Sequence, residues 1–307
     1  MATRILVTDG MDAGAIETLR KDGYEIVEKY YEPDELGAAL KDFDAVIIRS
    51  ATKIREAQID ACKGGKLQLI VRAGVGMDNI DIKYAEAAGI TVKNTPNSSA
   101  NAVAELALAH LFSTARNISI AGHTMREQKW EKKVYSKGYE LSGKTICIFG
   151  FGRIGTTVGI KCKALGMNVL AYDPFADKMM NKEKEVGMKF VSQEEAYEQA
   201  DIICMCAPSG DKPIVDADNL KKMKDGVVII NVSRGSNVNE EALLDGLKSG
   251  KVRAAGLDVY VDEKNPNWEL INCPAVSCTP HIGAGTKECQ ARIGLELVDV
   301  IKAKFEG

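Results

Sequence analysis

Short apolar runs alternate with longer amphipathic stretches along nearly the whole chain of 307 residues. Continuous apolar runs of this length are typical of parallel strands that helices cover on both faces. The pattern predicts five strands in the first third of the chain, in RILVTDG, YEIVEKY, DAVIIRS, LQLIVRAG and GITVKNTP. It predicts a second set in KTICIFG, MNVLAYDP, MKFVS, ADIICMCAP, GVVIINVS, RAAGLDVY and AVSCTP. The expected fold class is therefore α/β, with two doubly wound parallel sheets.

A long and almost wholly apolar segment, SSANAVAELALAHLFSTARNI, separates the two sets of strands. We expect it to form a helix capped by Ser98 or Ser99. A helix this apolar should be buried on all sides, which places it at a domain or subunit junction. The last helix, over residues 286–307, has no strand after it, so we expect it to return and cover the first sheet. Its apolar stripe consists of Ile293, Leu297, Val300 and Ile301.

Composition and charge exclude several classes of protein. The formal net charge is −3, so the chain has no basic field with which to bind nucleic acid. No apolar run approaches the roughly 20 residues of a membrane helix, and the start has no apolar core of signal-peptide length, so we expect a cytoplasmic protein. The eight cysteines are scattered. Cys204 and Cys206 share one face of a strand, but no second ligand pair accompanies them, so we expect buried, reduced thiols and no metal site.

The segment GFGRIG, residues 150–155, follows the strand KTICIF and opens a helix, and a second strand then ends in Asp173. This strand–turn–helix–strand context is typical of a dinucleotide-binding turn. The helix N-terminus would bind a pyrophosphate through its free N–H groups and dipole. Asp173 would accept hydrogen bonds from an adenosine ribose and repel a 2′-phosphate, which favours NAD over NADP. The residues expected to contact the cofactor here are Gly150, Gly152, Arg153, Ile154 and Gly155.

A second glycine pair, in Gly74-Val75-Gly76, also follows a predicted strand. It lacks the third glycine and the acidic strand end that a dinucleotide turn requires. We interpret it as a loop whose backbone amides point at a small anion.

The chain has three histidines. His110 lies in the middle of the long apolar helix, where we expect it to be buried, and His123 is expected to be solvated. His281 follows a strand end and a proline, and the small residues after it leave room for a ligand. Oxidation of an alcohol requires a base for the hydroxyl proton, and the ordinary imidazole pKa of about 6.5 suits that exchange.

Charged residues at other strand ends could complete such a site. A carboxylate would orient the imidazole, and an arginine would hold a substrate carboxylate through two hydrogen bonds. Arg234 ends one strand, and Asp258 and Glu263 follow another. Each of these residues alone could form an ordinary ion pair, but their common position at strand ends favours a functional site.

These motifs resemble the D-isomer-specific 2-hydroxyacid dehydrogenase family over essentially the whole chain. The matching segments are RAGVGMDNID, NTPNSSANAVAEL, LSGKTICIFGFGRIG, VLAYDP, INVSRG, AAGLDVY and TPHIGAGTKECQ. Within the family the chain is most similar to the phosphoglycerate dehydrogenases, through VIIRSATKI, VRAGVGMDNID and HIGAGTKE. The resemblance implies an enzyme that uses NAD to move a hydride on or off the 2-carbon of a small hydroxy acid.

By motif position, the resemblance implies His281 as the acid/base, Glu263 as its partner and Arg234 as the substrate-binding arginine. Family members usually have a proline directly after this glutamate, whereas Glu263 is followed by Lys-Asn-Pro and preceded by Asp262. Either carboxylate therefore remains a candidate for the partner of the histidine. Further cofactor contacts are implied for Pro208, Asp258 and Gly283, and further substrate contacts for Asn97 and the amides of Ala73, Gly74, Val75 and Gly76.

The resemblance also implies a domain organisation. A Rossmann-type NAD-binding domain, residues 98–285, is expected to be inserted in a flavodoxin-like substrate domain made of residues 1–97 and 286–307, with the active site in the cleft. The chain is expected to be a short form, without the C-terminal regulatory domains of longer relatives.

The expected reaction is oxidation of 3-phosphoglycerate to 3-phosphohydroxypyruvate, the first oxidation in serine biosynthesis. The phosphate requires cations besides Arg234, and Arg49 and Arg72 each end an apolar strand where a guanidinium could bind it. Both arginines could instead pair with surface carboxylates. The alternatives are a glyoxylate/hydroxypyruvate reductase, a D-lactate dehydrogenase, or a non-catalytic NAD-sensing regulator.

The apolar helix and the segment HTMREQKWEKK after it predict a homodimer. A buried helix and an exposed Trp130 both require a partner surface. In such a dimer, Lys132 or Lys133 could add positive charge to the site of the partner subunit.

Overall fold

The computed structural model describes residues 2–179 and 186–306. They form two compact units: unit 1 comprises Met1–Ser99 and Ala284–Gly307, and unit 2 comprises Ala100–Gly283. The sequence placed the two chain crossings after residues 97 and 285, and the structure has them after residues 99 and 283.

Within the described residues, unit 1 contains a five-stranded parallel sheet in the order β2-β1-β3-β4-β5, which is the flavodoxin-like doubly wound order. The predicted strands of the first set are all present. The strands are β1 (Arg4–Val7), β2 (Glu25–Glu28), β3 (Ala45–Ile48), β4 (Leu69–Arg72) and β5 (Thr91–Asn94). The helical segments between them are α1 (Ala13–Lys21), α2 (Pro33–Ala39), η1 (Leu40–Asp42), α3 (Glu56–Ala61) and α4 (Ile82–Ala87).

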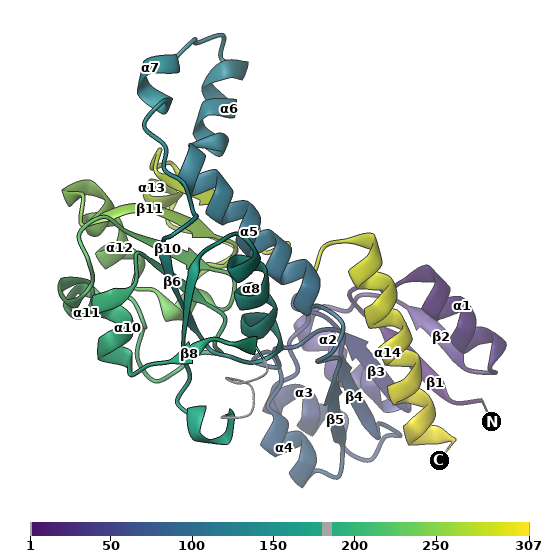
Figure 1. Cartoon of the computed structure of the whole chain (residues 1–307). Helices are drawn as coiled ribbons and strands as arrows, with labels where there is room; N and C mark the ends of the chain where they lie inside the picture. Colours follow the sequence, from purple (N-terminus) through teal and green to yellow (C-terminus); the bar gives the residue numbers. More distant parts are fainter. Residues whose placement is uncertain (1, 180–185, 307) are drawn as a thin grey trace. The chain divides into compact units, whose positions relative to one another are not determined.

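The last helix, α14 (Lys287–Phe305), returns to unit 1 and packs against α1, as predicted (Figure 1). A Cβ atom on Gly294 would lie 2.7 Å from the Cβ of Ala15, so the glycine allows the close approach of the two helices. The Tyr24 hydroxyl donates to Glu306 at 2.9 Å and fixes the end of the chain. The apolar stripe differs from the prediction at one position, because Val298 is buried where Val300 was expected.

Unit 2 contains, among its described residues, a seven-stranded parallel sheet in the order β12-β11-β10-β9-β6-β7-β8. Counted from β6, this is the Rossmann order 3-2-1-4-5-6 with one strand added at the edge. The predicted strands of the second set are all present. They are β6 (Thr145–Phe149), β7 (Asn168–Tyr172), β8 (Lys189–Phe190), β9 (Ile202–Met205), β10 (Val227–Asn231), β11 (Val252–Leu257) and β12 (Val276–Cys278).

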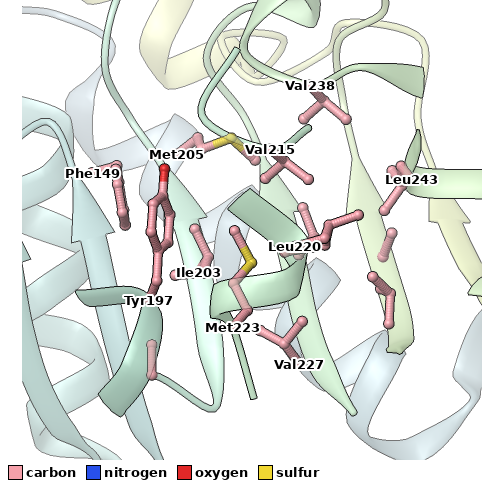
Figure 2. Close-up of a cluster of buried hydrophobic side chains, with 14 of the residues drawn as sticks. Phe149, Tyr197, Ile203, Met205, Val215, Leu220, Met223, Val227, Val238 and Leu243 are labelled. Atoms are coloured by element: carbon pink, nitrogen blue, oxygen red, sulfur yellow. The ribbon is translucent and has the colours of Figure 1, made fainter. Parts of the chain in front are cut away.

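Helical segments cover both faces of this sheet. They are α5 (Ala100–Arg116), α8 (Arg153–Ala164), η2 (Ala176–Met179), α10 (Gln193–Gln199), α11 (Ala217–Lys222), η3 (Gly235–Asn237), α12 (Glu240–Ser249) and α13 (Trp268–Ile271). Figure 2 shows the core on one face, where the ring of Tyr197 stacks on Phe149 with 5.5 Å between the centroids. The Tyr197 hydroxyl donates to the Ile214 carbonyl at 2.8 Å, so this buried polar atom has a partner.

The long apolar helix α5 packs against α8 and β11. We expected this helix to be buried on all sides. Within a single chain it is not, because Phe112 is 41% exposed. Beyond α5, the helices α6 (Ile118–Arg126) and α7 (Lys132–Tyr135) project from unit 2 as an arm (Figure 1), and neither contains a buried residue. Trp130 between them is 78% exposed. The arm therefore has no core of its own.

Candidate active site

The residues that sequence motifs assign to unit 2 follow strands of its parallel sheet. Because the carboxyl ends of parallel strands lie at the same edge, these residues share one edge of the sheet, where doubly wound folds bind ligands. In order, the glycine turn follows β6, Asp173 follows β7, Pro208 follows β9, Arg234 follows β10, Asp258 follows β11, and His281 follows β12.

The glycine turn has the geometry of a pyrophosphate site. Gly150 has φ +91°, and a Cβ there would lie 2.5 Å from the backbone nitrogen of Ala207. A Cβ on Gly155 would lie 2.1 Å from the carbonyl oxygen of Gly150, so helix and strand pack directly against each other. Gly152 has open space where its side chain would be, and it begins α8 with no side-chain cap. The free N–H groups at the start of α8, at Arg153 and Ile154, therefore fit a dinucleotide phosphate.

Asp173 is fixed at the end of β7. One carboxylate oxygen accepts the Phe151 amide at 2.8 Å, and the other accepts the Phe175 amide at 2.9 Å. Each carboxylate oxygen can accept a second hydrogen bond, so the side chain can still bind ribose hydroxyls. The bond to Phe151 ties this carboxylate to the glycine turn itself.

His281 and Glu263 form a close pair. Nδ1 of His281 lies 2.6 Å from Oε1 of Glu263, and the side chains are 35% and 44% exposed. The neighbouring Asp262 instead accepts the amides of Lys264 and Asn265 at 2.9 and 3.1 Å, so it closes a local turn. Of the two carboxylates that the sequence left open, Glu263 is the one that contacts the histidine.

A cavity of about 340 Å³ lies beside this pair. Its other walls include Tyr260, Trp268 and Pro280. The pair is therefore accessible from a hollow on the surface of unit 2.

The loop that carries His281 is bound to Asp258, whose side chain is 1% exposed. Its carboxylate accepts hydrogen bonds from the Thr279 hydroxyl at 2.6 Å, the Ile282 amide at 2.8 Å and the Gly283 amide at 2.9 Å. The backbone carbonyl of Asp258 also accepts the His281 amide at 2.8 Å. In this structure the carboxylate of Asp258 therefore organises the loop from within the protein.

Arg234 follows β10 in an extended backbone conformation and is half-buried. A Cβ on the next residue, Gly235, would lie 2.0 Å from the carbonyl carbon of Tyr260, so only glycine allows this approach. The buried Asn231 donates to the Arg234 carbonyl at 2.8 Å, and Asn237, also buried, donates to Ser233 at 3.0 Å. The arginine thus rests on a fully buried polar network.

In unit 1, the loop Ala73–Gly76 follows β4. The amides of Ala73 and Gly74 donate to carbonyls of Ile48 and Arg72 at 2.8 and 2.9 Å. The carbonyls of Gly74 and Val75 accept bonds from the end of β5, at 3.1 and 2.6 Å. In the part of the chain that the structure describes, the amides of Val75 and Gly76 donate to no protein group. These two amides are the donors that the loop can offer to an anion.

Arg72 and Arg49 lie at the same edge of the unit 1 sheet. Ile48 pairs with Arg72 in the register of β3 and β4, so Arg49 is one residue further along the neighbouring strand. The guanidinium of Arg72 folds over Gly74, where a Cβ would lie 1.5 Å from Nη1. The backbone of Arg49 is fixed by Asp9, which accepts its amide at 2.6 Å. Both arginines are half-buried.

Asn97 is bound to the last helix of unit 1. Its side-chain amide donates to Glu296 at 2.7 Å, and the Ser98 hydroxyl donates to the same carboxylate at 2.5 Å. In this structure, the side chain of Asn97 is therefore engaged by Glu296. Ser98, one of the two residues expected to cap α5, instead contacts α14.

The sequence did not single out Thr279, Asn231 or Asn237. Thr279 lies between a strand and a proline, and its spacing from other residues gives no sign of a role. An asparagine that follows a strand is also common in ordinary turns, so Asn231 and Asn237 did not stand out. The only sequence signal for Asn231 is that Asn231 and Ser233 interrupt an apolar run just before Arg234, in the segment INVSRG.

The remaining sequence expectations concern cysteines, metals and membranes. All eight cysteines are free, and five are buried: Cys62, Cys147, Cys162, Cys204 and Cys289. Among the described residues, no three His, Cys, Asp or Glu side chains are grouped as metal ligands. In those same residues, no helix has both the length and the apolar character needed to span a bilayer.

Comparison with known proteins gives the family. Residues 108–283 match the model of the D-isomer specific 2-hydroxyacid dehydrogenase, NAD binding domain. A hydroxypyruvate reductase of Thermotoga maritima is 40% identical over 304 residues, with 97% of each chain covered. A D-3-phosphoglycerate dehydrogenase of Archaeoglobus fulgidus is 39% identical over 308 aligned positions, with 99% of this chain and 58% of the relative covered. The crystal structure of a glyoxylate reductase from Paecilomyes thermophila superposes with a TM-score of 0.88 at 28% identity, covering 100% of this chain and 96% of the other.

The chain therefore belongs to the D-isomer-specific 2-hydroxyacid dehydrogenases, which are NAD-dependent oxidoreductases. The glycine turn, Asp173 and α8 lie within the residues that match the NAD-binding domain. The family, the fold class and the NAD cofactor predicted from the sequence are confirmed. The chain spans a little over half of the A. fulgidus relative, whose name specifies a phosphorylated substrate.

Proposed function

We propose that this enzyme interconverts a D-2-hydroxy acid and its 2-oxo acid with His281 as the acid/base. The observation that carries the proposal is the 2.6 Å contact between His281 Nδ1 and Glu263. Because Glu263 engages Nδ1, Nε2 is the ring nitrogen left to exchange a proton with the substrate. Glu263 also balances the positive charge that the ring gains when it takes that proton.

Each residue of the site then has a defined task. A nicotinamide cofactor bound in unit 2 would supply the hydride acceptor for oxidation at C2. His281 takes the hydroxyl proton, and in the reduction direction it returns that proton to the oxygen. In unit 2, Arg234 would bind the substrate carboxylate through two hydrogen bonds. In unit 1, the amides of Val75 and Gly76 are two donors that fit an anionic group.

The preferred cofactor is NAD rather than NADP. Asp173 supports this proposal, because its carboxylate is fixed beside the glycine turn at the end of β7. At that position it would accept hydrogen bonds from the ribose hydroxyls and repel a 2′-phosphate. Pro208 and Gly283 are the further residues assigned to the cofactor. Asp258, which the resemblance also assigned to the cofactor, is buried, and its carboxylate is engaged by the loop that carries His281.

For the substrate, we propose 3-phosphoglycerate and 3-phosphohydroxypyruvate, a step of serine biosynthesis. The supporting observation is the position of Arg49 and Arg72 on adjacent strands at one sheet edge. Within the described residues Arg49 forms no ion pair, so pairing with a surface carboxylate does not explain it. A guanidinium binds phosphate oxygens through charge-assisted hydrogen bonds, each worth about 1.5–3 kcal/mol.

The test compares phosphohydroxypyruvate with hydroxypyruvate, which differ only in the phosphate. We expect Arg49→Ala and Arg72→Ala each to reduce the preference in kcat/KM for the phosphorylated substrate by about 10- to 100-fold. Arg20→Ala is the matched control, since Arg20 is an exposed arginine of unit 1 that pairs with Glu28 at 3.1 Å. Equal kcat/KM for both substrates in the wild type would refute the proposal that Arg49 and Arg72 form a phosphate-binding site.

A hydroxypyruvate reductase is the second candidate. It is favoured by the Thermotoga maritima relative of that name, which matches this chain over 97% of both lengths. Efficient reduction of hydroxypyruvate, unaffected by either arginine substitution, would select this function. Absence of turnover with every 2-oxo acid would leave only a non-catalytic NAD-sensing role.

The protein is further proposed to be a homodimer through α5 and the arm. The exposed apolar residues Phe112, Ile118, Met125, Trp130 and Val134 support this, because they would be covered by a second copy. Lys132 or Lys133 in the arm would then add positive charge to the site of the partner subunit. A stable monomer in sedimentation at micromolar concentration would exclude this assembly.

A further inference from the structure

The buried His110 contacts the loop that carries His281. His110 lies in the middle of α5, and it is 2% exposed. Its Nε2 is 3.1 Å from the Thr279 hydroxyl, and its Nδ1 is 3.0 Å from the Ser277 hydroxyl. The Thr279 hydroxyl donates in turn to Asp258 at 2.6 Å. A chain of side-chain hydrogen bonds thus links α5 to the carboxylate that organises the catalytic loop.

The direction of these hydrogen bonds follows from their chemistry. The proton of the Thr279 hydroxyl goes to Asp258, because a carboxylate can only accept. Thr279 therefore accepts from His110, which requires a proton on Nε2. Burial lowers the pKa of His110, and the charge of Asp258 raises it by less. The ring is consequently neutral, with one N–H directed at Thr279, and its Nδ1 accepts the Ser277 hydroxyl.

Asp258 holds His281 in an unusual backbone conformation. His281 has φ +53°, in the left-handed region that residues other than glycine rarely occupy. Such a conformation is strained and persists only where its surroundings fix it. Here the amides of His281 and Ile282, which flank the Cα of His281, donate to the backbone carbonyl and to a carboxylate oxygen of Asp258, respectively.

Simple packing is the alternative explanation for His110. Its Cβ lies close to β11, where a Cβ on Gly256 would be only 2.6 Å away, so the residue fills the space between helix and strand. A methionine of similar volume would fill that space equally well. It would not replace the hydrogen bond to Thr279, and this difference separates the two explanations.

We propose that His110 is a positioning residue for the reaction. By donating from Nε2 to Thr279, it fixes the carboxylate of Asp258 and, through it, the left-handed backbone that presents His281 to the substrate. This inference rests on the proposed role of His281 as acid/base. It assigns a function to a residue that the sequence places in the core of an apolar helix.

The first test measures turnover and stability in a matched series. His110→Met and His110→Asn both remove the donor to Thr279, and we expect kcat to fall by about 10- to 100-fold, the scale of a small displacement of a catalytic group. KM for NADH should stay near the wild-type value, and the melting temperature should fall only as far as the lost hydrogen bonds of Thr279 and Ser277 require, so that the variants stay folded in the assay. His110→Gln places an amide N–H where Nε2 lies, and kcat should return to within about threefold of the wild type. Thr114→Val, which removes a buried hydroxyl one turn further along α5, is the control and should change neither quantity.

The second test observes His281 directly and does not need a substrate. With three histidines in the chain, ¹⁵N-labelled imidazoles can be assigned by substitution. We expect the His281 ring resonances to move in His110→Met and to keep their wild-type positions in His110→Gln. If folded His110→Met shows wild-type kcat and wild-type resonances, or if folded His110→Gln is as slow as His110→Met, the proposal is overturned. Absence of wild-type turnover with all 2-oxo acids would refute the proposed function instead, and the resonances alone would then decide the role of His110.

Discussion

The burial of His110 predicts a loss of stability in mildly acidic solution. Burial lowers the pKa of this histidine in the folded protein, whereas in the unfolded chain it stays near 6.5. Well above pH 6.5 the His110 ring is neutral in both the folded and the unfolded state, so its contribution to the free energy of unfolding does not change with pH. Between 6.5 and the lower folded-state pKa, the unfolded chain binds one more proton than the folded protein. The free energy of unfolding therefore falls by about 1.4 kcal/mol for each pH unit of acidification in that window.

The assay compares urea unfolding of the wild type and His110→Met at pH 7.5 and pH 5.5. Other titrating groups contribute equally to both proteins, so their difference isolates His110. If the His110 ring stays neutral in the folded state, the free energy of unfolding should fall by about 1.4 kcal/mol more in the wild type than in the variant between pH 7.5 and pH 5.5. Thr114→Val should lose as much as the wild type, since it keeps His110. Equal losses in the wild type and His110→Met would refute the reasoning, because the folded state would then accept the proton freely.

Three substitutions and one control substitution test the cofactor and catalytic assignments. Asp173→Ala should narrow the preference for NADH over NADPH in kcat/KM, and a wild type that uses both cofactors equally would disprove the ribose contact. Gly155→Ala should abolish NADH binding measured by fluorescence, because the new Cβ would lie 2.1 Å from a carbonyl oxygen of the turn. Glu263→Gln should lower kcat and alter its pH profile, while Asp262→Asn should leave both nearly unchanged; a larger effect from Asp262→Asn would reverse the choice of carboxylate.

The sequence was sufficient to predict the architecture, because the apolar runs of both sheets mark buried parallel strands. Each predicted strand is present. No strand follows α14 in the sequence, and the helix returns to unit 1. The glycine turn was also predictable, because its three glycines stand at fixed spacing between a strand and a helix, and the contact that requires Gly155 is with the nearby Gly150. For α5 the sequence left open what covers the helix, because apolar composition does not tell whether the chain itself or a second copy does so.

Contacts between residues that are far apart in the chain could not be predicted from the sequence. The choice between Asp262 and Glu263 depends on the path of the loop after β11, where Asp262 closes a turn on the following amides. The link from His110 to Thr279 joins residues 169 positions apart and leaves no periodic signal. Similarly, only the fold shows that two of the four amides in Ala73–Gly76 are bound to carbonyls of unit 1.

The most direct test of the central claim is the turnover of His281→Asn with NADH and a panel of 2-oxo acids that includes phosphohydroxypyruvate, hydroxypyruvate, glyoxylate and pyruvate. We predict that kcat falls by roughly 10²–10⁴-fold relative to the wild type while the dissociation constant for NADH is unchanged. A His281→Asn enzyme that retained wild-type kcat would contradict the assignment of His281 as the acid/base.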